Sequence, residues 1–222
     1  IRDRSPSRGL GDVYKRQPLF EPGKEDPKWE ITTVDGEKTI FDLVCVCTGH
    51  LTKPVHVPEF QDEFTGTYMH SHDYKEPEPM IGKRVCVVGV GNSAVDVASD
   101  VCVNTKRCVL VARSGVWIAP KMVFGVAFTD LTDYINRPWV PAWLRKKLVL
   151  FLVWCVHGKP EKLGLPPATE RVHATSSGTV VNDIAYRRIE VKHGIERIEG
   201  QTIHFTDGTS DEFDVLVAAT GY

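Results

Sequence analysis

Residues 83–98 read Lys-Arg-Val-Cys-Val-Val-Gly-Val-Gly-Asn-Ser-Ala-Val-Asp-Val-Ala. The apolar run at 85–88 is typical of a buried strand, and residues 92–101 carry the pattern of a helix. A second apolar strand is predicted at 107–112. Glycines between the first strand and the helix direct the amino end of the helix toward a dinucleotide pyrophosphate. This order predicts an α/β fold, a Rossmann-type domain with a doubly wound parallel sheet.

The small residues of the glycine loop each have a predicted role in binding a dinucleotide. Gly89 makes the tight turn, and Gly91 leaves space for the pyrophosphate against the backbone. Ala94 occupies the third small position, where the helix packs against the strand. The motif alone is weak evidence, but the strand before it and the helix and strand after it make it specific.

The residue that ends the second strand bears on the choice of coenzyme. Arg113 stands where an NAD site carries Asp or Glu for the ribose 2′-hydroxyl. A guanidinium there can instead pair with a 2′-phosphate, and Ser114 adds a hydroxyl group. A solvated surface arginine is the alternative. The sequence predicts a preference for NADP(H) over NAD(H).

A repeat relates two distant parts of the chain. Residues 31–49 align without a gap with residues 203–221, so that isoleucines, Asp-Gly pairs, Phe-Asp pairs and Thr-Gly pairs coincide. Each copy is predicted to form a strand, an Asp-Gly turn, a second strand and an apolar strand that must be covered on both faces. Unrelated hairpins with common turn residues are the alternative, but duplication into two similar domains is favoured. The strand ends expected to approach the ligands are Thr48, Gly49, Thr220 and Gly221.

The composition excludes several classes of protein. The chain is 42% apolar and 25% charged, as in globular proteins, and its net charge of −2 argues against nucleic-acid binding. Its longest apolar run, 148–156, is too short to span a bilayer, which takes roughly 20 residues. The six cysteines lie in or beside apolar runs without a Cys-x-x-Cys pair. They are expected to be reduced core residues of a cytoplasmic protein that has no metal site.

Residues 137–157 carry three tryptophans and a helical apolar face. That face recurs at i, i+4, i+8 and i+11, at Leu144, Leu148, Leu152 and Cys155. A core helix is the favoured interpretation. The alternatives are the wall of a substrate tunnel, or contact with a membrane surface with Lys146 and Lys147 on the polar side. Membrane contact is therefore not expected.

Residues 64–75, Phe-Thr-Gly-Thr-Tyr-Met-His-Ser-His-Asp-Tyr-Lys, resemble the fingerprint of the flavin-containing monooxygenases. Related Baeyer–Villiger monooxygenases carry Trp at the last aromatic position of this fingerprint. Thr48-Gly49-His50 resembles the family's exit from its flavin domain, and the pair Asn92-Ser93 and the run 113–117 match its NADPH site. The resemblance covers residues 29–222. Its marked fingerprint positions are Phe64, Gly66, His70 and Tyr74.

The resemblance implies an FAD domain that is interrupted by an NADPH domain. The expected parts are closing strands of the first half of the FAD domain (18–55), a linker with the fingerprint (56–80), the NADPH-binding domain (81–216) and a truncated return to the FAD domain (217–222). Residues 1–17 resemble a translated sequencing adapter and are predicted to be an artefact. The family's active-site Asn lies outside this sequence, so no catalytic residue is assigned, and the chain alone is predicted to be inactive.

The implied activity is that of an FAD- and NADPH-dependent monooxygenase of the N,N-dimethylaniline type. It transfers one oxygen atom of O₂, through a flavin hydroperoxide, to a soft nitrogen or sulfur nucleophile of a small molecule. The alternatives are a Baeyer–Villiger enzyme acting on ketones, which Tyr74 disfavours, and a non-catalytic NADP-binding module. A hydrogen-bonded structural role is favoured for His70 over proton transfer, and no metal pair with His72 is expected. The residues expected to bind NADPH are Gly89, Gly91, Asn92, Ser93, Ala94, Arg113 and Ser114.

Overall fold

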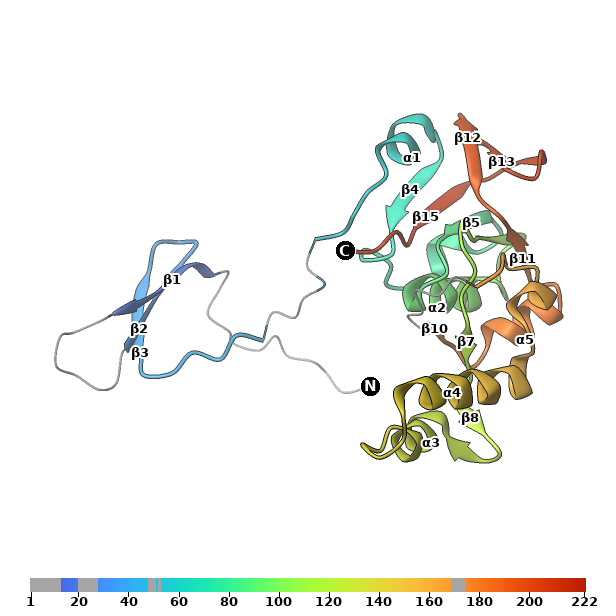
Figure 1. Ribbon diagram of the computed structural model, residues 1–222. Helices are drawn as coiled ribbons and strands as arrows, with labels where there is room; N and C mark the ends of the chain where they lie inside the picture. The colour runs from blue at the N-terminus through green and yellow to red at the C-terminus, as the bar shows by residue number, and fades with distance from the viewer. Residues whose placement is uncertain (1–12, 20–27, 48–50, 52, 169–174) are drawn as a thin grey trace. The chain divides into compact units, whose positions relative to one another are not determined.

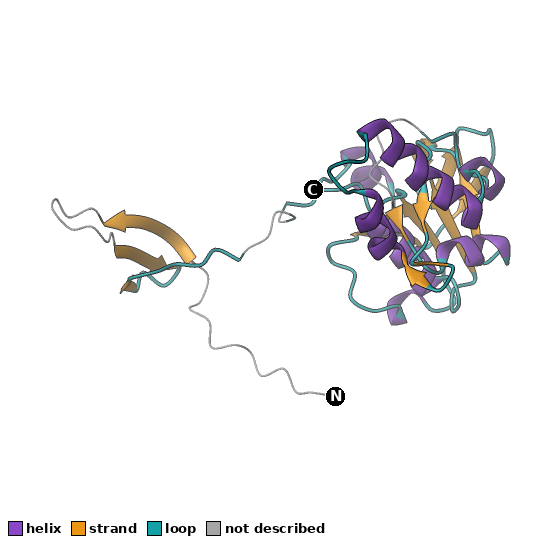
Figure 2. Cartoon of the chain, turned by 60° about the horizontal axis from the view of Figure 1, so that its bottom comes forward, coloured by secondary structure: helices purple, strands orange, loops and turns teal. Residues whose placement is uncertain are grey.

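The computed structural model describes residues 13–19, 28–47, 51, 53–168 and 175–222. The chain divides into two compact units, Ile1–Thr52 and Lys53–Tyr222. Figure 1 traces the elements of both units along the chain, and Figure 2 separates helices from strands.

The first unit holds a three-stranded antiparallel sheet in the order β1-β2-β3. Its strands are β1 (Val13–Leu19), β2 (Lys28–Thr33) and β3 (Lys38–Phe41). An Asp-Gly turn connects β2 to β3, with Gly36 at φ +85°, and Ile31 of β2 is buried. Strand β1 crosses the boundary expected after residue 17, so that boundary has no counterpart in the secondary structure.

The apolar strand predicted at the end of this first repeat copy is wrong. Residues 43–47 form no strand, and the Leu43 side chain is 76% exposed. A strand of a parallel sheet is stable only where neighbouring strands pair with it and other elements cover its two faces. The described residues of the first unit include neither a helix nor a parallel neighbour.

The second unit is built on a five-stranded parallel sheet in the order β11-β6-β5-β15-β4 (Figure 1). This sheet and the helix after β5 confirm the Rossmann-type α/β class. The strands are β4 (Thr67–His70), β5 (Arg84–Val88), β6 (Arg107–Val111), β11 (Ile189–Lys192) and β15 (Val215–Ala218).

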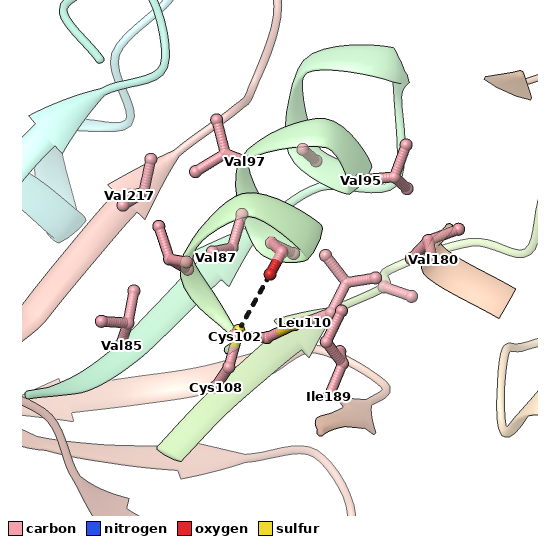
Figure 3. Close-up of a cluster of buried hydrophobic side chains, with 14 of the residues drawn as sticks. Val85, Val87, Val95, Val97, Cys102, Cys108, Leu110, Val180, Ile189 and Val217 are labelled. Carbon is pink, nitrogen blue, oxygen red and sulfur yellow. Dashed lines mark hydrogen bonds between the residues drawn. The ribbon is translucent and has the colours of Figure 1, made fainter. Parts of the chain in front are cut away.

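Different elements cover the two faces of this sheet. Helices α2 (Asn92–Val101) and α5 (Val180–Ala185) pack on the face that carries Val85 and Val87. Figure 3 shows the side chains of this cluster. The other face, which carries Cys86 and Leu216, packs against an antiparallel sheet and α1. These covering elements are β12 (Ile195–Glu199), β13 (Thr202–Phe205), β14 (Ser210–Glu212) and α1 (Pro58–Glu63).

The chain between β6 and α5 forms smaller elements, several of which gather at one end of the unit (Figure 1). In α4 only Val153 is buried, so the favoured interpretation of this segment as a core helix is wrong. No helix in the described part of the chain is long and apolar enough to cross a bilayer. The elements are β7 (Ile118–Ala119), β8 (Met122–Val123), β9 (Val126–Ala127), α3 (Phe128–Ile135), α4 (Ala142–His157) and β10 (Thr175–Ser176). Short 3₁₀ turns lie at Glu78–Met80 and Pro160–Leu163.

The structure also differs from the expected segment boundaries and cysteine environments. Residues 56–80, expected as a linker, supply the edge strand β4 of the sheet, and β15 runs across the boundary expected after residue 216. All six cysteines are unpaired. Three of them are not core residues as expected, because the segments that carry them are only partly covered. Cys86, Cys102 and Cys108 are buried, whereas Cys45, Cys47 and Cys155 are exposed.

Candidate functional site

The candidate site lies at the carboxyl edge of the parallel sheet. Parallel strands end at the same edge, so the segments that follow β4, β5, β6 and β15 meet there. These segments carry the fingerprint, the glycine loop, the Arg113 run and the second Thr-Gly pair. The topology therefore brings together most of the residues singled out in the sequence.

The glycine loop has the backbone geometry that its sequence predicts. The Gly89 N–H donates to the Val111 carbonyl oxygen at 2.9 Å, and its φ is +125°. A Cβ at Gly89 would lie 2.5 Å from the Ala219 carbonyl oxygen, so only glycine fits. At Gly91, by contrast, a Cβ would meet nothing within 4 Å. Gly89 holds the turn against β15, and Gly91 borders open space of the kind a pyrophosphate needs.

Helix α2 presents an uncapped amino end to this space. Gly91 is its N-cap residue, no side chain caps it, and no acidic residue occupies its first turn. Ala94 is fully buried in the core, while Asn92 and Ser93 are exposed. The first backbone N–H groups of a helix lack intrahelical partners and carry partial positive charge. This end of α2 can therefore accept an anionic group.

A segment that the sequence analysis missed fixes the glycine loop in place. The Thr175 hydroxyl donates to the Val90 carbonyl oxygen at 2.6 Å, and the Ser176 N–H donates to the Asn92 side-chain oxygen at 2.9 Å. Asn92 therefore uses its amide oxygen to hold the loop. The sequence Thr-Ser-Ser-Gly at 175–178 could have indicated this role, because hydroxyl-rich stretches often form hydrogen bonds with nearby backbone groups.

Arg113 and Ser114 extend the edge beyond β6. Both are exposed and follow the fully buried Ala112. Within the described residues, no carboxylate forms an ion pair with Arg113. A Cβ at the next residue, Gly115, would overlap the Pro166 carbonyl, which keeps this part of the backbone close to residues 166–168. The guanidinium is thus available to an external anion.

The first half of the fingerprint packs beneath the sheet. Phe64 is 5% exposed and belongs to the core cluster on the face opposite α2. A Cβ at Gly66 would lie 2.7 Å from the Phe64 ring and 2.8 Å from the Asp214 carbonyl oxygen. The spacing of Phe64 and Gly66 is therefore a packing requirement of this fold.

His70 ends strand β4 with a fully buried imidazole. Its Nδ1 accepts a hydrogen bond from the His72 N–H at 3.1 Å, so the neutral ring carries its proton on Nε2. Burial lowers the pKa of His70, and the neighbouring His56 lowers it further, against a weaker opposing effect of Asp73. Its ring centroid lies 5.3 Å from that of His56 and 5.6 Å from that of Tyr222. Among the described residues the buried Nε2 has no hydrogen-bond partner, so the hydrogen-bonded structural role favoured for His70 stays a prediction.

Tyr74 connects the fingerprint to the nucleotide-binding motif. Its hydroxyl donates to Asp100 Oδ2 at 2.5 Å, and Asp100 lies near the end of α2. Burial, followed by the bond to Asp100, raises the pKa of the Tyr74 phenol. The last aromatic residue of the fingerprint thus contacts α2, the helix whose other end is uncapped beside the glycine loop.

The second Thr-Gly pair holds a distant segment at the edge. The Thr220 hydroxyl donates to the Val55 carbonyl oxygen, and the Val55 N–H donates to the Gly221 carbonyl oxygen at 2.9 Å. Thr48 and Gly49, predicted as their counterparts in the first copy, lie outside the described residues. Within those residues, no group of three or more His, Cys, Asp or Glu side chains could hold a metal ion.

Comparison with known proteins identifies the family. A family model described as flavin-binding monooxygenase-like matches residues 20–222. Dimethylaniline monooxygenase [N-oxide-forming] 2 of Mus musculus is 31% identical over 94% of this chain and 41% of its own length. Indole-3-pyruvate monooxygenase YUCCA1 of Oryza sativa subsp. japonica is 30% identical over 87% of this chain and 50% of its own length.

Comparison with solved structures shows the fold. An open crystal structure of cyclohexanone monooxygenase superposes with a TM-score of 0.63 at 17% identity, over 92% of this chain and 52% of that one. The chain thus spans about half, or less, of the length of the proteins it matches. The family match supports the FAD and NADPH predicted from the sequence. The chain belongs to the family of flavin-binding monooxygenases and their relatives.

Proposed function

We propose that this chain is the NADPH-binding part of an FAD- and NADPH-dependent monooxygenase that transfers one oxygen atom of O₂ to soft nitrogen or sulfur nucleophiles. One observation carries the proposal. The open space at Gly91, the uncapped amino end of α2 and the exposed Arg113 all lie at the same sheet edge. An anionic dinucleotide with a 2′-phosphate fits this arrangement.

The chain's own residues would hold and orient the coenzyme. The first-turn N–H groups at Ser93 and Ala94 would bind the pyrophosphate, while Gly91 leaves the room it needs. Arg113 and Ser114 would bind the 2′-phosphate. Asn92, tied to Ser176, would keep the loop in the required conformation. When bound, NADPH supplies the hydride that reduces the flavin.

An FAD site would need a second glycine loop besides the one assigned to NADPH. In the part of the chain that the structure describes, one glycine loop precedes a helix, and we assign it to NADPH. A second dinucleotide pyrophosphate needs a loop and helix end of its own. We therefore propose that this chain alone binds NADPH, holds no FAD and oxygenates nothing. The unpaired cysteines support a cytoplasmic location, which is part of the same proposal.

The relatives do not separate the substrate classes, because one named for N-oxide formation and one named as an indole-3-pyruvate monooxygenase match the chain at similar identity. The proposed class therefore rests on Tyr74. Tyr74, where Baeyer–Villiger enzymes carry Trp, supports nitrogen or sulfur oxygenation over ketone oxygenation. Comparing an amine, a sulfide and a ketone for stimulation of NADPH oxidation, in a protein that carries a complete flavin domain, tests this choice.

The coenzyme assignment is testable with this chain by isothermal titration calorimetry. Arg113→Ala should weaken NADP⁺ binding by about 2 kcal/mol, because a charge-assisted contact is lost, while weak NAD⁺ binding stays the same. Arg187→Ala is the control, because it removes an exposed charge just before β11, at the amino edge of the sheet opposite the proposed site. Equal losses for both coenzymes would contradict the role given to Arg113.

The glycine loop offers an independent test. Gly91→Val should abolish NADP⁺ binding, because its side chain fills the space reserved for the pyrophosphate. The new Cβ itself would meet no protein atom within 4 Å. The circular dichroism spectrum should stay unchanged. A Gly91→Val protein that still binds NADP⁺ would move the site elsewhere. Gel filtration after addition of FAD should give a colourless protein, and stoichiometric flavin retention would refute the assignment of the single loop.

A further inference from the structure

The segment 175–178 lies between β7 and the glycine loop. Its strand β10 pairs in parallel with β7, with Ser176 opposite Ala119. The Ser177 N–H donates to the Ala119 carbonyl oxygen at 3.2 Å. Backbone N–H groups of successive strand residues point to opposite sides, so the Ser176 N–H faces away from β7 and toward the glycine loop.

Two further contacts fix this segment in the unit. The Thr175 hydroxyl donates to the Val90 carbonyl oxygen at 2.6 Å, and Thr175 itself is buried. Ser177 is also buried, and its Oγ accepts a hydrogen bond from the Val180 N–H at 3.2 Å. Val180 begins α5, which packs against α2. The segment is therefore held by β7, by α5 and by the glycine loop, so its backbone has a fixed position.

The Ser176 N–H determines which way the Asn92 amide is turned. A backbone N–H can only donate, so the atom that faces it at 2.9 Å is Asn92 Oδ1. An amide carries its acceptor on one side and its NH₂ group on the other, so Nδ2 is directed away from Ser176. Among the described residues, Asn92 forms no other hydrogen bond. Its two N–H donors are therefore left for solvent or for a ligand.

The same bond leaves the amino end of α2 open. Asn side chains readily accept hydrogen bonds from backbone N–H groups near the start of a helix. Asn92 is the first residue of α2, but its oxygen is engaged by Ser176, and no side chain caps the helix. It is exposed, and it follows Gly91, where an added Cβ would meet nothing within 4 Å. The Asn92 NH₂ group and the first N–H groups of α2 thus border the same open space.

We propose that Ser176 is a positioning residue of the coenzyme site, whose N–H turns Asn92 so that Asn92 Nδ2 donates to a pyrophosphate oxygen of the dinucleotide. This role rests on the proposed function, because it needs a dinucleotide at the glycine loop. Phosphate oxygens are charged acceptors, which form strong hydrogen bonds. The pyrophosphate is common to NADP⁺ and NAD⁺. Ser176 and Asn92 therefore act on both coenzymes, whereas Arg113 is assigned to the 2′-phosphate of NADP⁺ alone.

A purely structural role for Ser176 is the competing interpretation. The loop backbone is already held by the bond from Thr175 to Val90 and by the bond from Gly89 to Val111. If the Ser176 N–H only added to this support, its loss would weaken coenzyme binding whether or not Asn92 carries an amide. If it turns the Asn92 amide, its loss has no effect once that amide is removed. The two roles therefore differ in a double-mutant cycle.

Isothermal titration calorimetry of the full chain with NADP⁺ and NAD⁺ tests the Asn92 contact. Asn92→Asp keeps an oxygen for the Ser176 N–H but replaces the NH₂ group with a negatively charged oxygen. It should weaken both coenzymes by the same factor, at least about tenfold, because a hydrogen bond to a charged group is lost. Asn104→Asp, the same change at an exposed position beyond the other end of α2, should bind like the parent. An Asn92→Asp protein that binds like the parent, or that loses NADP⁺ binding alone, would overturn the proposal.

The double-mutant cycle tests the role of Ser176. Ser176→Pro removes the N–H without removing a bond to β7, and should weaken both coenzymes about three- to tenfold with an unchanged circular dichroism spectrum. The conservative variant Ser176→Ala keeps the N–H and should bind within about twofold of the parent. In an Asn92→Ala background, Ser176→Pro should change binding by less than about twofold, because its effect passes through the amide.

The outcomes separate this role of Ser176 from the proposed function. If the parent chain binds NADP⁺ but Ser176→Pro costs as much with Asn92→Ala as without it, Ser176 is only structural and the proposed positioning is wrong. If the parent chain binds no NADP⁺, the proposed function is wrong and the positioning role falls with it. If Ser176→Pro alters the circular dichroism spectrum, the comparison of Asn92→Asp with Asn104→Asp decides.

Discussion

The two copies of the internal repeat share a turn but differ in the strand that follows it. In the first copy the Gly36 N–H donates to the Thr33 carbonyl oxygen at 3.0 Å, and in the second the Gly208 N–H donates to the Phe205 carbonyl oxygen at 3.0 Å. The two glycines have φ values of +85° and +79°. Matched residues make matched bonds, so the Asp-Gly turn is specified locally.

The apolar strand behaves differently in the two copies. In the second copy β15 pairs with β5 on one side and β4 on the other, and all its residues are buried. In the first copy residues 43–47 have a similar apolar sequence but form no strand. An apolar run of this kind acquires a defined structure only between sheet neighbours and covering layers. The turn is therefore a property of the local sequence, and the strand is a property of the unit around it.

The largest expected difference between the copies is in core stability. Leu216 and Val44 are matched positions, but Leu216 is fully buried between β5 and β4, and Val44 is half-exposed. Leu216→Ala should reduce the free energy of unfolding by about 2–5 kcal/mol, because it opens a cavity. Val44→Ala should change it by less than about 0.5 kcal/mol. Urea unfolding followed by circular dichroism measures both, and similar losses would remove the distinction between the copies.

Thiol labelling compares the accessibility of one matched position in the two copies. Cys45 of the first copy matches Val217 of the second, and Cys45 is exposed whereas Val217 is fully buried. In a Val217→Cys variant, the new thiol should react with a maleimide at least about a hundredfold more slowly than Cys45, because it reacts only after local opening. Mass spectrometry of labelled peptides gives the rates. Cys86, whose pKa burial raises, is the buried internal control.

The aspartates of the two Phe-Asp pairs, Asp42 and Asp214, are expected to contribute differently to stability, by a smaller amount that depends on pH. Asp214 accepts hydrogen bonds from the Arg84 backbone at 2.8 Å and side chain at 2.9 Å, which lower its pKa to about 2. Among the described residues, Asp42 forms one ion pair, with Lys28 at 3.2 Å on the surface. Asp214→Asn should cost about 1 kcal/mol after allowance for solvent screening, and Asp42→Asn less than about 0.5 kcal/mol.

The sign of the pH effect follows from the lowered pKa of Asp214. Its folded pKa lies below the ordinary value of 3.8, so its contribution to stability is present above about pH 4 and lost as the pH falls toward 2. Asp214→Asn should flatten the stability curve in that window. An equal flattening by Asp42→Asn would show that the two ion pairs are equivalent.

The smallest effect is expected where the copies are alike. Gly36→Ala and Gly208→Ala each place a side chain at positive φ with nothing within 4 Å of the new Cβ. Each should destabilise its own turn by about 0.5–1 kcal/mol, because backbone strain is the only cost. Hydrogen exchange at the Thr33 and Phe205 amides, which bond across the two turns, reports each loss. Clearly unequal losses would contradict a shared local turn.

These contrasts also show which features the sequence could predict. Helix α2 and strands β5 and β6 were predicted within a residue of their observed ends, because loop chemistry and continuous apolar runs specify them locally. Strand β4 was missed. Its sequence, Thr-Tyr-Met-His, is short and mixed, and only pairing with β15 makes it a strand. The exposure of α4 was missed because helical apolar periodicity predicts that one side of a helix is apolar. It does not show whether another element covers that side.

The candidate site was predictable where one residue type alone satisfies the geometry. Gly89 and Gly66 are required by backbone and ring contacts that the motifs encode. The roles of Thr175 and Ser176 were not predictable, because they contact the glycine loop only through the pairing of β7 with β10. The bond between Tyr74 and Asp100 likewise joins segments that only the tertiary fold brings together.

The close approach of Gly89 to Ala219 has a consequence for protein engineering. The contact lies where β5 and β15, neighbours in the sheet, both end. The shape of this edge therefore depends on the pairing of the two strands and not on how many residues separate them in the sequence. The tip of the β8–β9 hairpin at Gly125 lies between the two strands in the sequence, is exposed, and would meet nothing with an added Cβ. Exposed loop tips are where inserted domains are tolerated. A reporter domain inserted at this tip should leave the contact between Gly89 and Ala219 intact, so the chain can be lengthened there without changing the glycine loop.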